Sequence, residues 1–457
     1  MKPHPFTMLV ALGAVVGFIF ATVSTYDFVI HLDRQLHGIH CSYFPGLGET
    51  DTAGTSGCHA TLMSPYSSVL RGRFWGGLPV SLPGMSIFAF ILFLAVDLMI
   101  TRRQADLRAI GLLLATATVP VVTSVVMGYL SLVELGVACK SCIGIYAASV
   151  LAFAFSLALF IRTLRRRRGA TKNRGGEEAK GAEAPPESDE VPRSKPAKAA
   201  RRSGRHGPLR WGGVVALCAI GGAFVCVPLG LYAAIAPRFD QYVGSCGELS
   251  RSADTNRVLV PLGSSSSPVS MIEVIDPLCS ACRALETRLT VSGLSTQVSR
   301  RALLFPLDAE CNWMVDRSIH PGACAVSEGM LCAGDAADDV LAWAFEEQEH
   351  IIDASRADPT AAQRMVTERF PELRRCVGSA EVRARLNRAL RWAVSNQLPV
   401  SAPQLYVEGR KLCDEDTDLG LEYMLPRLIR SARPAARAEL PGPRVASSDE
   451  NVEGVRP

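Results

Sequence analysis

Cysteines are the residues of this sequence whose type and spacing could do chemistry. The 457-residue chain contains 14 of them, and two pairs have the C-x-x-C spacing, Cys139-Lys-Ser-Cys142 and Cys279-Ser-Ala-Cys282. Two thiols at this spacing are typical of metal sites in a reducing cytosol and of disulfide exchange in an oxidising compartment. The compartment in which the cysteines lie therefore decides between the two chemistries.

The composition indicates a protein that is embedded in a membrane. Hydrophobic residues make up 48% of the chain and charged residues 20%, whereas about a quarter of the residues in a typical soluble domain are charged. These values exclude a wholly disordered chain and a purely soluble enzyme, and the net charge of +4 is too small for nucleic-acid binding by bulk charge. Five segments have the apolar length that crosses a bilayer: Phe6–Val23, Leu82–Ile100, Ala109–Leu130, Val137–Ile161 and Trp211–Ile235.

Two basic clusters orient these spans. Thr101–Arg108 lies between spans two and three, and Arg162–Arg168 follows span four, so the positive-inside rule places both clusters in the cytoplasm. The loop Thr25–Ser81, the turn Ser131–Leu135 and everything after Ile235 then lie outside, and the fifth span carries the last domain across. The first segment lacks a small-residue cleavage motif and is long for a signal peptide, so we expect it to be retained.

Two polar segments lack the apolar periodicity of folded structure. Residues 162–210 hold 15 Lys and Arg against 6 Asp and Glu, and we interpret them as a disordered cytoplasmic linker. A basic segment can also bind nucleic acid or anionic lipid, but a solvated tether is the favoured interpretation. Residues 433–457 are polar and contain proline, so we expect a disordered tail.

The segment after the fifth span alternates between predicted strands and helices. Val258–Leu262 and Ser270–Ile275 are short runs rich in Val, Ile and Leu, which are typical of strands, and Cys279 follows at a strand–turn–helix transition. We expect Cys279 at the helix N-terminus, where free N–H groups and the helix dipole favour its thiolate, with Cys282 as the buried resolving partner. Further strands are predicted at 297–305, 404–407 and 411–413, and helices at about 326–395 and from 419.

This segment, about residues 250–432, resembles the thioredoxin fold with a helical insertion, in the variety used by bacterial periplasmic dithiol oxidases. The resemblance rests on the pattern strand–D-P-x-C-x-x-C–helix, on the inserted helices and on Ala402-Pro403 before a strand that ends in Glu408-Gly-Arg. It implies that Pro403 is a cis proline that faces the C-x-x-C pair and helps to present the substrate backbone. Ala402 stands where that family more often has Thr or Val. The alternative, half of a zinc site, lacks a second suitable Cys/His pair nearby.

Six further cysteines lie beyond the fifth span: Cys246, Cys311, Cys324, Cys332, Cys376 and Cys413. The stretch that contains Cys311 and Cys324 is similar to a motif in membrane-fused members of this fold, from which we expect a structural disulfide between them. The other pairings stay open. His320 in the same stretch is a candidate catalytic residue, with a structural role as the favoured alternative. Cys218 and Cys226 lie within the fifth span, where we expect free, buried and inert thiols.

The remaining four cysteines fall on the outer side of the membrane in the topology derived from charge. Cys41 and Cys58 lie in the first external loop, about residues 25–81, and Cys139 and Cys142 lie at the outer end of span four. A disulfide can therefore pass between the loop pair and the span pair.

This arrangement resembles the vitamin K epoxide reductase family, whose bacterial members often carry a thioredoxin-like domain after a fifth span. The resemblance rests on the four-helix bundle, the loop pair, the C-x-x-C on span four and the string Cys58-His-Ala-Thr-Leu-Met-Ser64-Pro-Tyr-Ser-Ser-Val. It implies that Ser64 and Tyr146 form part of a quinone site, with Tyr146 hydrogen-bonded to a quinone carbonyl. The segment Gly77-Leu-Pro79 resembles the G-x-P segment that opens span two.

Two features depart from the pattern of that family. Sixteen residues separate Cys41 from Cys58, more than in most members, although the Gly- and Thr-rich insert still permits a disulfide. Lys140 stands at a usually apolar position between Cys139 and Cys142. Its side chain could reach the membrane interface and stabilise a thiolate at Cys139.

The fold class predicted is a multi-domain protein with an α-helical membrane bundle followed by an α/β thioredoxin-like domain. The bundle comprises a four-helix core (residues 1–161) and a fifth transmembrane helix (residues 211–235), which the linker (residues 162–210) connects. The resemblance implies a multi-pass thiol:quinone oxidoreductase of the bacterial inner membrane, with the thioredoxin-like domain on the periplasmic side. Reduced secreted or periplasmic proteins would give two electrons to Cys279–Cys282, and the loop and span pairs would pass them to the membrane pool of ubiquinone or menaquinone. We expect no metal and no nucleic-acid partner.

Two alternatives stay open at this point. Electrons could run the other way, as in a disulfide reductase or isomerase, because the sequence does not fix redox potentials. The last domain could also be a thiol-binding module or chaperone whose cysteines are structural. Catalytic disulfides are reduced readily, whereas structural disulfides resist reduction. Free-thiol counts under mild reduction therefore distinguish a binding module from an oxidoreductase. Vitamin K epoxide itself is not the expected substrate in a bacterium.

Overall fold

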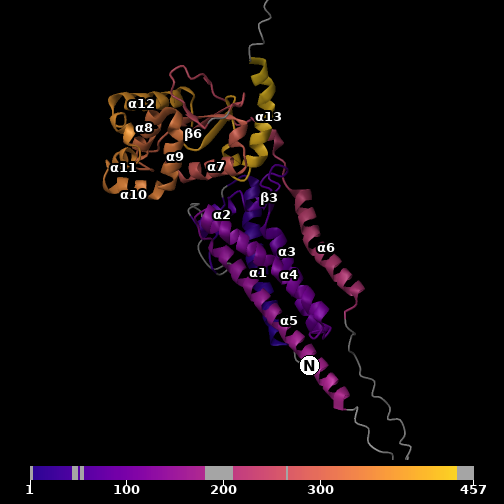
Figure 1. Cartoon of the computed structure of the whole chain (residues 1–457). Helices are drawn as coiled ribbons and strands as arrows, with labels where there is room; N and C mark the ends of the chain where they lie inside the picture. The colour runs from indigo at the N-terminus through magenta and orange to yellow at the C-terminus, as the bar shows by residue number, and fades with distance from the viewer. Residues whose placement is uncertain are drawn as a thin grey trace, which may run out of the picture. The chain divides into compact units, whose positions relative to one another are not determined.

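The computed structural model divides the chain into two compact units, Met1–Pro237 (unit 1) and Arg238–Pro457 (unit 2). The residues that the structure describes are 4–35, 37–43, 50–51, 56–180, 209–263 and 266–439. Unit 1 is helical and unit 2 combines helices with a sheet (Figure 1). The predicted fold class, a helical apolar region followed by a mixed α/β region, is confirmed.

Unit 1 is built on five long helices: α1 (Pro5–Ile30), α3 (Ser81–Ile100), α4 (Leu107–Tyr129), α5 (Lys140–Lys180) and α6 (Trp211–Ile235). Apolar residues occupy all sides of their central parts, which is typical of helices that lipid surrounds. The segments long and apolar enough to cross a membrane are Pro5–Asp33, Ser81–Ile100, Leu107–Glu134, Lys140–Arg168 and Trp211–Ile235. The five predicted spans are thus confirmed as helices of sufficient length, and the first extends well beyond Val23.

Small residues let α1 approach its neighbours closely. α1 packs against α3 and α5, and α4 packs against α5. A side chain at Gly13 would lie 3.2 Å from the backbone nitrogen of Ala152 on α5, and one at Gly17 would overlap the ring of Phe88 on α3. Gly13 and Gly17 form a G-x-x-x-G pattern, which supports close helix packing in membranes. This packing holds α5, and with it the span pair, against the end of the bundle that carries the loop.

The connection between α1 and α3 contains only short elements: η1 (His31–Asp33), β1 (Ile39–His40), β2 (Thr50–Asp51), α2 (Gly57–Leu62), β3 (Ser68–Val69) and β4 (Leu78–Pro79). β1 pairs with β2 and β3 pairs with β4, both antiparallel. Helix α2 contacts β1 and also α5, which begins after the π-helical turn η2 (Leu130–Glu134). The loop therefore folds back onto the first turns of α5.

The segment Gly77-Leu-Pro79 leads directly into α3 through β4. Gly77 has φ +77°, and a side chain there would lie 2.7 Å from the carbonyl oxygen of Val69, so both the backbone and the space require glycine. The hydroxyl of Tyr232 on α6 donates a hydrogen bond to the Gly77 carbonyl at 2.9 Å. This bond ties the fifth span to the loop.

Two expected boundaries were wrong. Helix α5 continues through Arg162–Arg168 to Lys180, where we expected the linker to begin at Arg162. A helix that is already nucleated extends cheaply through residues of good helix propensity such as Arg, Ala, Lys and Glu. Helix α13 (Leu421–Glu439) likewise runs past residue 433 for the same reason. Residues 181–208 and 440–457 of the expected linker and tail lie outside the described residues.

Unit 2 contains a five-stranded sheet in the order β5-β7-β6-β8-β9. The strands are β5 (Val260–Leu262), β6 (Ser270–Ile275), β7 (Ser299–Leu304), β8 (Gln404–Val407) and β9 (Arg410–Lys411). β6 and β7 are parallel, and the other neighbouring pairs are antiparallel. β6 and β8 lie where predicted, whereas the last strand ends at Lys411 because the chain there turns into the 3-10 helix η7 (Asp414–Asp416). Two parallel central strands with α7 between them and a closing antiparallel pair are the thioredoxin arrangement.

Helices cover this sheet. α7 (Ser280–Val291) follows β6, and a helical insertion separates β7 from β8: α8 (Ala323–Ala333), α9 (Ala337–Glu346), α10 (Gln348–Ala357), α11 (Ala361–Arg369) and α12 (Ala380–Ser395). Short 3-10 turns complete the unit: η3 (Asp240–Tyr242), η4 (Ser295–Gln297), η5 (Gly334–Ala336) and η6 (Pro371–Arg375). The predicted helical region at about 326–395 is confirmed.

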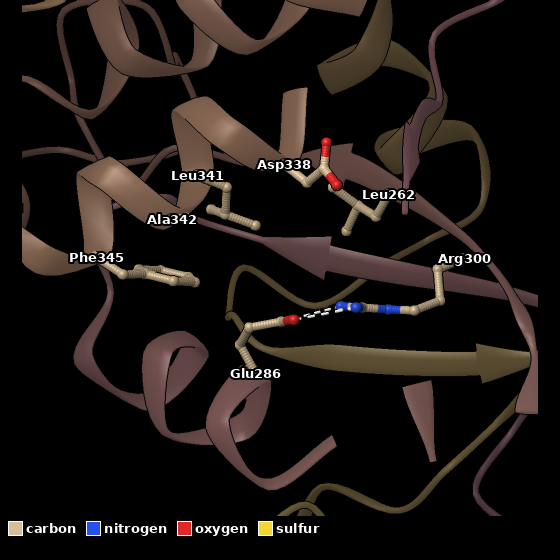
Figure 2. A pocket seen from close by; sticks show the side chains of 7 residues that line it. All are labelled: Leu262, Glu286, Arg300, Asp338, Leu341, Ala342 and Phe345. Atoms are coloured by element: carbon tan, nitrogen blue, oxygen red, sulfur yellow. Dashed lines mark hydrogen bonds and ion pairs between the residues drawn. The ribbon is translucent and has the colours of Figure 1, made fainter. Parts of the chain in front are cut away.

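A buried ion pair fixes α7 to the sheet. Arg300 on β7 donates to Glu273 on β6 at 2.5 Å and to Glu286 on α7 at 3.0 Å. Figure 2 shows the Arg300–Glu286 pair beside the apolar side chains of Leu341 and Phe345. Because removing one partner of a buried ion pair leaves an uncompensated charge, this contact sets the position of α7, whose N-terminus carries Cys279.

Candidate functional site

Cys279 is the N-cap residue of α7, and Cys282 lies in the first turn of that helix. Both side chains are buried, with 6% and 2% of their surface exposed. A hydrogen bond from the Cys282 thiol lowers the pKa of Cys279 to about 7, against the opposing effect of burial. Burial raises the pKa of Cys282 well above its ordinary value. Cys279 is therefore the thiolate-forming member of the pair at neutral pH, and the thiolate is the nucleophile in disulfide exchange.

A cis peptide bond faces this pair. The bond between Ala402 and Pro403 is cis, and the Cys279 thiol lies 3.6 Å from the Ala402 carbonyl oxygen. The side-chain amide of Gln404 donates to the carbonyl oxygens of Pro399 and Ser401, at 3.0 and 2.6 Å. These bonds hold the turn that precedes β8, so the backbone around Pro403 lies next to the nucleophilic sulfur.

Asp276, which is not among the predicted site residues, is a buried carboxylate that organises the same region. It accepts hydrogen bonds from the backbone N–H of Leu278 and Leu307, both at 2.7 Å. Its second oxygen also lies 2.8 Å from Nδ1 of His320. Burial alone would lower the pKa of His320, but the hydrogen bond and charge of Asp276 outweigh it and raise that pKa. The signal for Asp276 was its position three residues before Cys279.

The loop that carries His320 is held by a disulfide and a carboxylate. Cys311 and Cys324 form a disulfide, as predicted. The carboxylate of Asp308 accepts hydrogen bonds from the Ser318 hydroxyl at 2.7 Å and from the Gly322 N–H at 2.9 Å. The disulfide and the Asp308 carboxylate therefore hold the loop in the conformation that places His320 beside Asp276.

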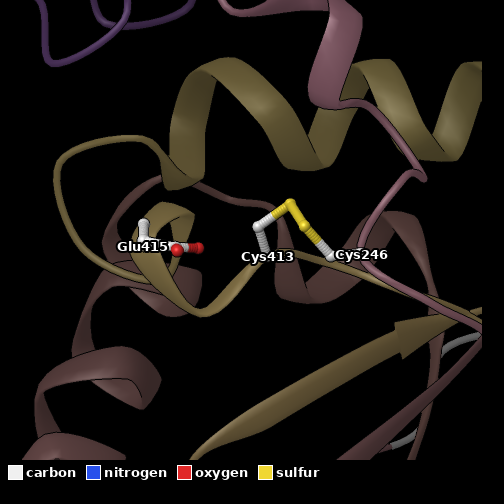
Figure 3. A group of neighbouring side chains, drawn as sticks. All are labelled: Cys246, Cys413 and Glu415. Atoms are coloured by element: carbon white, nitrogen blue, oxygen red, sulfur yellow. A yellow bond between two sulfur atoms is a disulfide. The ribbon is translucent and has the colours of Figure 1, made fainter. Parts of the chain in front are cut away.

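Two further disulfides close unit 2. Cys332 pairs with Cys376 and joins α8 to the turn before α12. Cys246 pairs with Cys413 across 167 residues, and the Glu415 carboxylate lies beside this bond (Figure 3). Cysteines that are joined in a disulfide offer no thiolate to a metal ion, so this group of residues acts in the structure as a disulfide crosslink.

The loop pair and the span pair of unit 1 lie together. Cys41 forms a disulfide with Cys58, and Cys139 forms one with Cys142. A side chain at Gly57 would overlap the carbonyl oxygen of Ala138, so α2 touches the backbone next to the span pair. Cys58 is 3% exposed, whereas Cys41 is only partly buried.

The span pair repeats the local geometry of the pair in unit 2. Cys139 directly precedes α5, and its carbonyl accepts the N–H of Ile143 at 3.1 Å. Its sulfur accepts the N–H of Cys142 at 3.2 Å, which is the bond that favours negative charge on an N-cap sulfur. The Nζ of Lys140, the residue that could stabilise a thiolate at Cys139, lies 5.9 Å from the ring centroid of Tyr43.

Ser64 is buried in a turn of the loop and its hydrogen bonds are local. Its hydroxyl donates to the Thr61 carbonyl at 2.7 Å and accepts from the Tyr66 N–H at 3.3 Å. The buried guanidinium of Arg71 donates to the Ser64 carbonyl and, at 3.0 Å, to the Ser67 hydroxyl. These bonds favour a structural role for Ser64. Arg71, which was not among the predicted site residues, stabilises this turn through its hydrogen bonds.

Tyr146 lies on α5 one turn beyond Cys142 and lines an apolar hollow of that helix. The other residues of the hollow are Ile143, Ala147, Val150, Leu151, Ala154 and Phe155. Within the part of the chain that the structure describes, the Tyr146 hydroxyl has no hydrogen-bond partner. A flat apolar molecule with a carbonyl oxygen fits such a surface.

Cys218 and Cys226 are free thiols on α6, as predicted, but their expected burial was wrong. Both are exposed on the helix surface. Helix α6 packs against α3 through Phe224 and the rings of Phe90 and Phe93, and it leaves most of its other residues without protein neighbours. In a transmembrane helix such side chains face lipid.

Comparison with known proteins supports the description of unit 1. Residues 8–157 match the model of the family described as the vitamin K epoxide reductase family. Reduced DsbA1 from Neisseria meningitidis is similar in structure over 39% of this chain and 94% of its own, with 16% identity and a TM-score of 0.28. The thioredoxin-like fold of unit 2 rests on its own strand order. No curated protein matches the sequence.

Proposed function

We propose that this chain, in which residues 8–157 form a domain of the vitamin K epoxide reductase family fused to a thioredoxin-like domain, is a thiol:quinone oxidoreductase. Thiol–disulfide redox activity follows from the family domain and the three cysteine pairs. The proposal adds the direction and the acceptor: cysteine pairs of extracytoplasmic proteins are oxidised, and a membrane quinone receives the two electrons. The contact of α2 with the start of α5, which brings Cys58 beside the span pair, carries the proposal.

The first exchange begins at Cys279. Its disulfide with Cys282 accepts two electrons from a reduced client and becomes a dithiol. The Cys279 thiolate then attacks Sγ of Cys41, the more accessible member of the loop pair. A bond between Cys279 and Cys41 forms, the bond between Cys41 and Cys58 breaks, and the electron pair stays on Cys58. Cys282 attacks Cys279 and releases Cys41.

The second exchange takes place within unit 1. The Cys58 thiolate attacks Sγ of Cys139, so that a Cys58–Cys139 bond forms, the Cys139–Cys142 bond breaks, and Cys142 becomes a thiolate. Cys41 then attacks Cys58, which restores the loop disulfide and releases Cys139 with its electron pair. The span pair is now reduced, and its Cys142 lies one helical turn from Tyr146.

The residues near Cys142 fit a quinone. The apolar side chains beside Tyr146 suit its ring and tail, and the Tyr146 hydroxyl can donate to a quinone carbonyl. A bound quinone, either ubiquinone or menaquinone, would supply the acceptor for two electrons and two protons. The contribution of this chain is to hold the span pair, to exclude water with the apolar face of α5 and to orient the carbonyl through Tyr146.

Trapping of the first mixed disulfide tests the order of the exchanges. In a Cys282→Ser variant, Cys279 has lost its resolving partner, so the Cys279–Cys41 disulfide should accumulate and appear in peptide mapping by mass spectrometry. The matched Cys282→Ser, Cys41→Ser double variant should show no such peptide. A mixed disulfide of Cys279 with Cys58 instead would place the entry point at the other loop cysteine, and no mixed disulfide with either would contradict the relay.

A further inference from the structure

Ser141, which lies between Cys139 and Cys142 in the first turn of α5, contacts the segment that carries the loop pair. Its Oγ donates to the carbonyl oxygen of His40 at 2.9 Å and lies 3.8 Å from Sγ of Cys58. His40 is the residue directly before Cys41. One hydroxyl group on α5 therefore contacts Cys58 and the residue that precedes Cys41.

The loop end of this contact is anchored to α1 by a buried carboxylate. Asp27, which is 2% exposed, accepts the backbone N–H of His40 at 2.9 Å and lies 2.6 Å from Nδ1 of the His40 ring. The position of the His40 carbonyl is thus fixed from both sides, by Asp27 on α1 and by Ser141 on α5. The chain of contacts runs from α1 through the loop to α5.

Cys58 needs a hydrogen-bond donor when its disulfide opens. With 3% of its surface exposed, a thiolate at Cys58 is screened from water, and burial disfavours the charged form of a cysteine. A hydroxyl group already within reach of the sulfur can compensate by donating to it. Hydrogen bonds to a charged acceptor are stronger than those to a neutral carbonyl. The Ser141 hydroxyl therefore forms a stronger hydrogen bond when it rotates from the His40 carbonyl to the thiolate.

We propose that Ser141 is a positioning residue that holds the loop pair on the span pair and stabilises the thiolate that Cys58 carries between the two exchanges. The inference rests on the proposed relay and deepens it. In the disulfide state the hydroxyl donates to His40. When Cys279 attacks Cys41 and the electron pair leaves on Cys58, the hydroxyl rotates to the Cys58 sulfur and keeps it beside Cys139, whose bond to Cys142 it then breaks.

The test isolates this step from quinone and client. In full-length protein carrying Cys41→Ser, Cys58 is a free thiol next to the intact disulfide of the span pair. Its attack on Cys139 forms the Cys58–Cys139 bond, breaks the Cys139–Cys142 bond and leaves the electron pair on Cys142, with no added oxidant. The reaction is started by a rise in pH and stopped by alkylation, and mass spectrometry reports whether Cys58 or Cys142 is alkylated.

Three variants are compared in this background over a range of pH. Ser141→Ala should slow the exchange about tenfold and move the midpoint of its pH profile upward by about one unit, because one hydrogen bond to the thiolate is lost. Ser141→Thr keeps the hydroxyl and should restore most of the rate. Ser149→Ala is the matched control, because Ser149 is a fully buried serine on the same helix that lies 3.2 Å from the Ser124 hydroxyl.

The outcomes separate the possible failures. An unchanged exchange rate and pH midpoint in Ser141→Ala would overturn the inference. An equal effect of Ser149→Ala would also overturn it, because the effect would then come from helix packing. A raised midpoint in Ser141→Ala alone supports it. The exchange assay contains no quinone, so its result does not depend on quinone reduction. If the wild-type protein failed to reduce quinone in a separate assay, the proposed function would be overturned but the result for Ser141 would stand.

Discussion

Cys279 has a depressed pKa because its neighbours favour the thiolate over the thiol. The Cys282 thiol donates a hydrogen bond to its sulfur, and the charge of His320 acts in the same direction. Alkylation of Cys279 by iodoacetamide should therefore follow a pH profile with a midpoint at about 7, with the rate falling as the pH drops and the sulfur is protonated.

His320 should contribute to that midpoint through its charge. Asp276 raises the pKa of His320, and the positive charge of His320 in turn favours the Cys279 thiolate. His320→Asn removes this positive charge and should shift the alkylation midpoint to higher pH, by up to about one unit. His350→Asn, at a 70% exposed histidine on α10, is the control and should leave the midpoint unchanged. Equal midpoints in the two variants would refute a role for His320.

Tyr146 should affect the acceptor step alone. Tyr146→Phe removes a hydroxyl that has no partner among the described residues, so we expect the protein to fold normally. Loss of one hydrogen bond to a quinone carbonyl, worth about 1 kcal/mol, should lower kcat/KM for quinone about fivefold. The rate at which the protein oxidises a client peptide in one turnover should not change. A matching loss in Ser64→Ala would show that Ser64 also contacts the quinone, despite its local hydrogen bonds.

Among the helices, the approach of α2 to α5 is the contact that the proposed relay requires. Gly57→Ala places a methyl group where the Ala138 carbonyl lies, so α2 and Cys58 must move away from the span pair. We expect slower exchange between the pairs by about tenfold or more, since disulfide exchange needs close approach of the sulfurs. Gly84→Ala on α3, where a side chain meets no atom within 4 Å, is the control. Unchanged quinone reduction in Gly57→Ala would contradict this account.

The sequence predicts the elements that carry cysteines better than the contacts between them. The five apolar runs and the strand before Cys279 have strong local patterns, so they were found. Ser141 and His40 are 101 residues apart, and nothing local links them. Cys246 and Cys413 are 167 residues apart, and six cysteines allow 15 pairings, so their partnership required the fold. The end of α5 was missed because a preceding span nucleates a helix that composition alone does not predict.

In the whole molecule, the proposed relay requires all three cysteine pairs to lie on the same side of the membrane. The charge pattern predicts that the turn between α3 and α4 is cytoplasmic and that unit 2 is outside. In spheroplasts, a membrane-impermeant maleimide should modify a cysteine introduced at the exposed Ser252 but not one introduced at the exposed Ala105. Both should react after the membrane is permeabilised. Labelling of Ala105→Cys in intact spheroplasts would reverse the topology.

The proposed relay passes electrons from a client through three cysteine pairs to a quinone. The direct measurement is quinone absorbance in a single turnover of pre-oxidised, full-length protein in detergent, with a reduced cysteine peptide as client and separate trials of a ubiquinone and a menaquinone. Wild-type protein should consume one of the quinones, and neither Cys142→Ser nor Cys279→Ser should do so. Two results together would contradict the proposed direction: no consumption of either quinone by the wild type, and reduction of an oxidised peptide when quinol is supplied. Electrons would then run from quinol to the peptide.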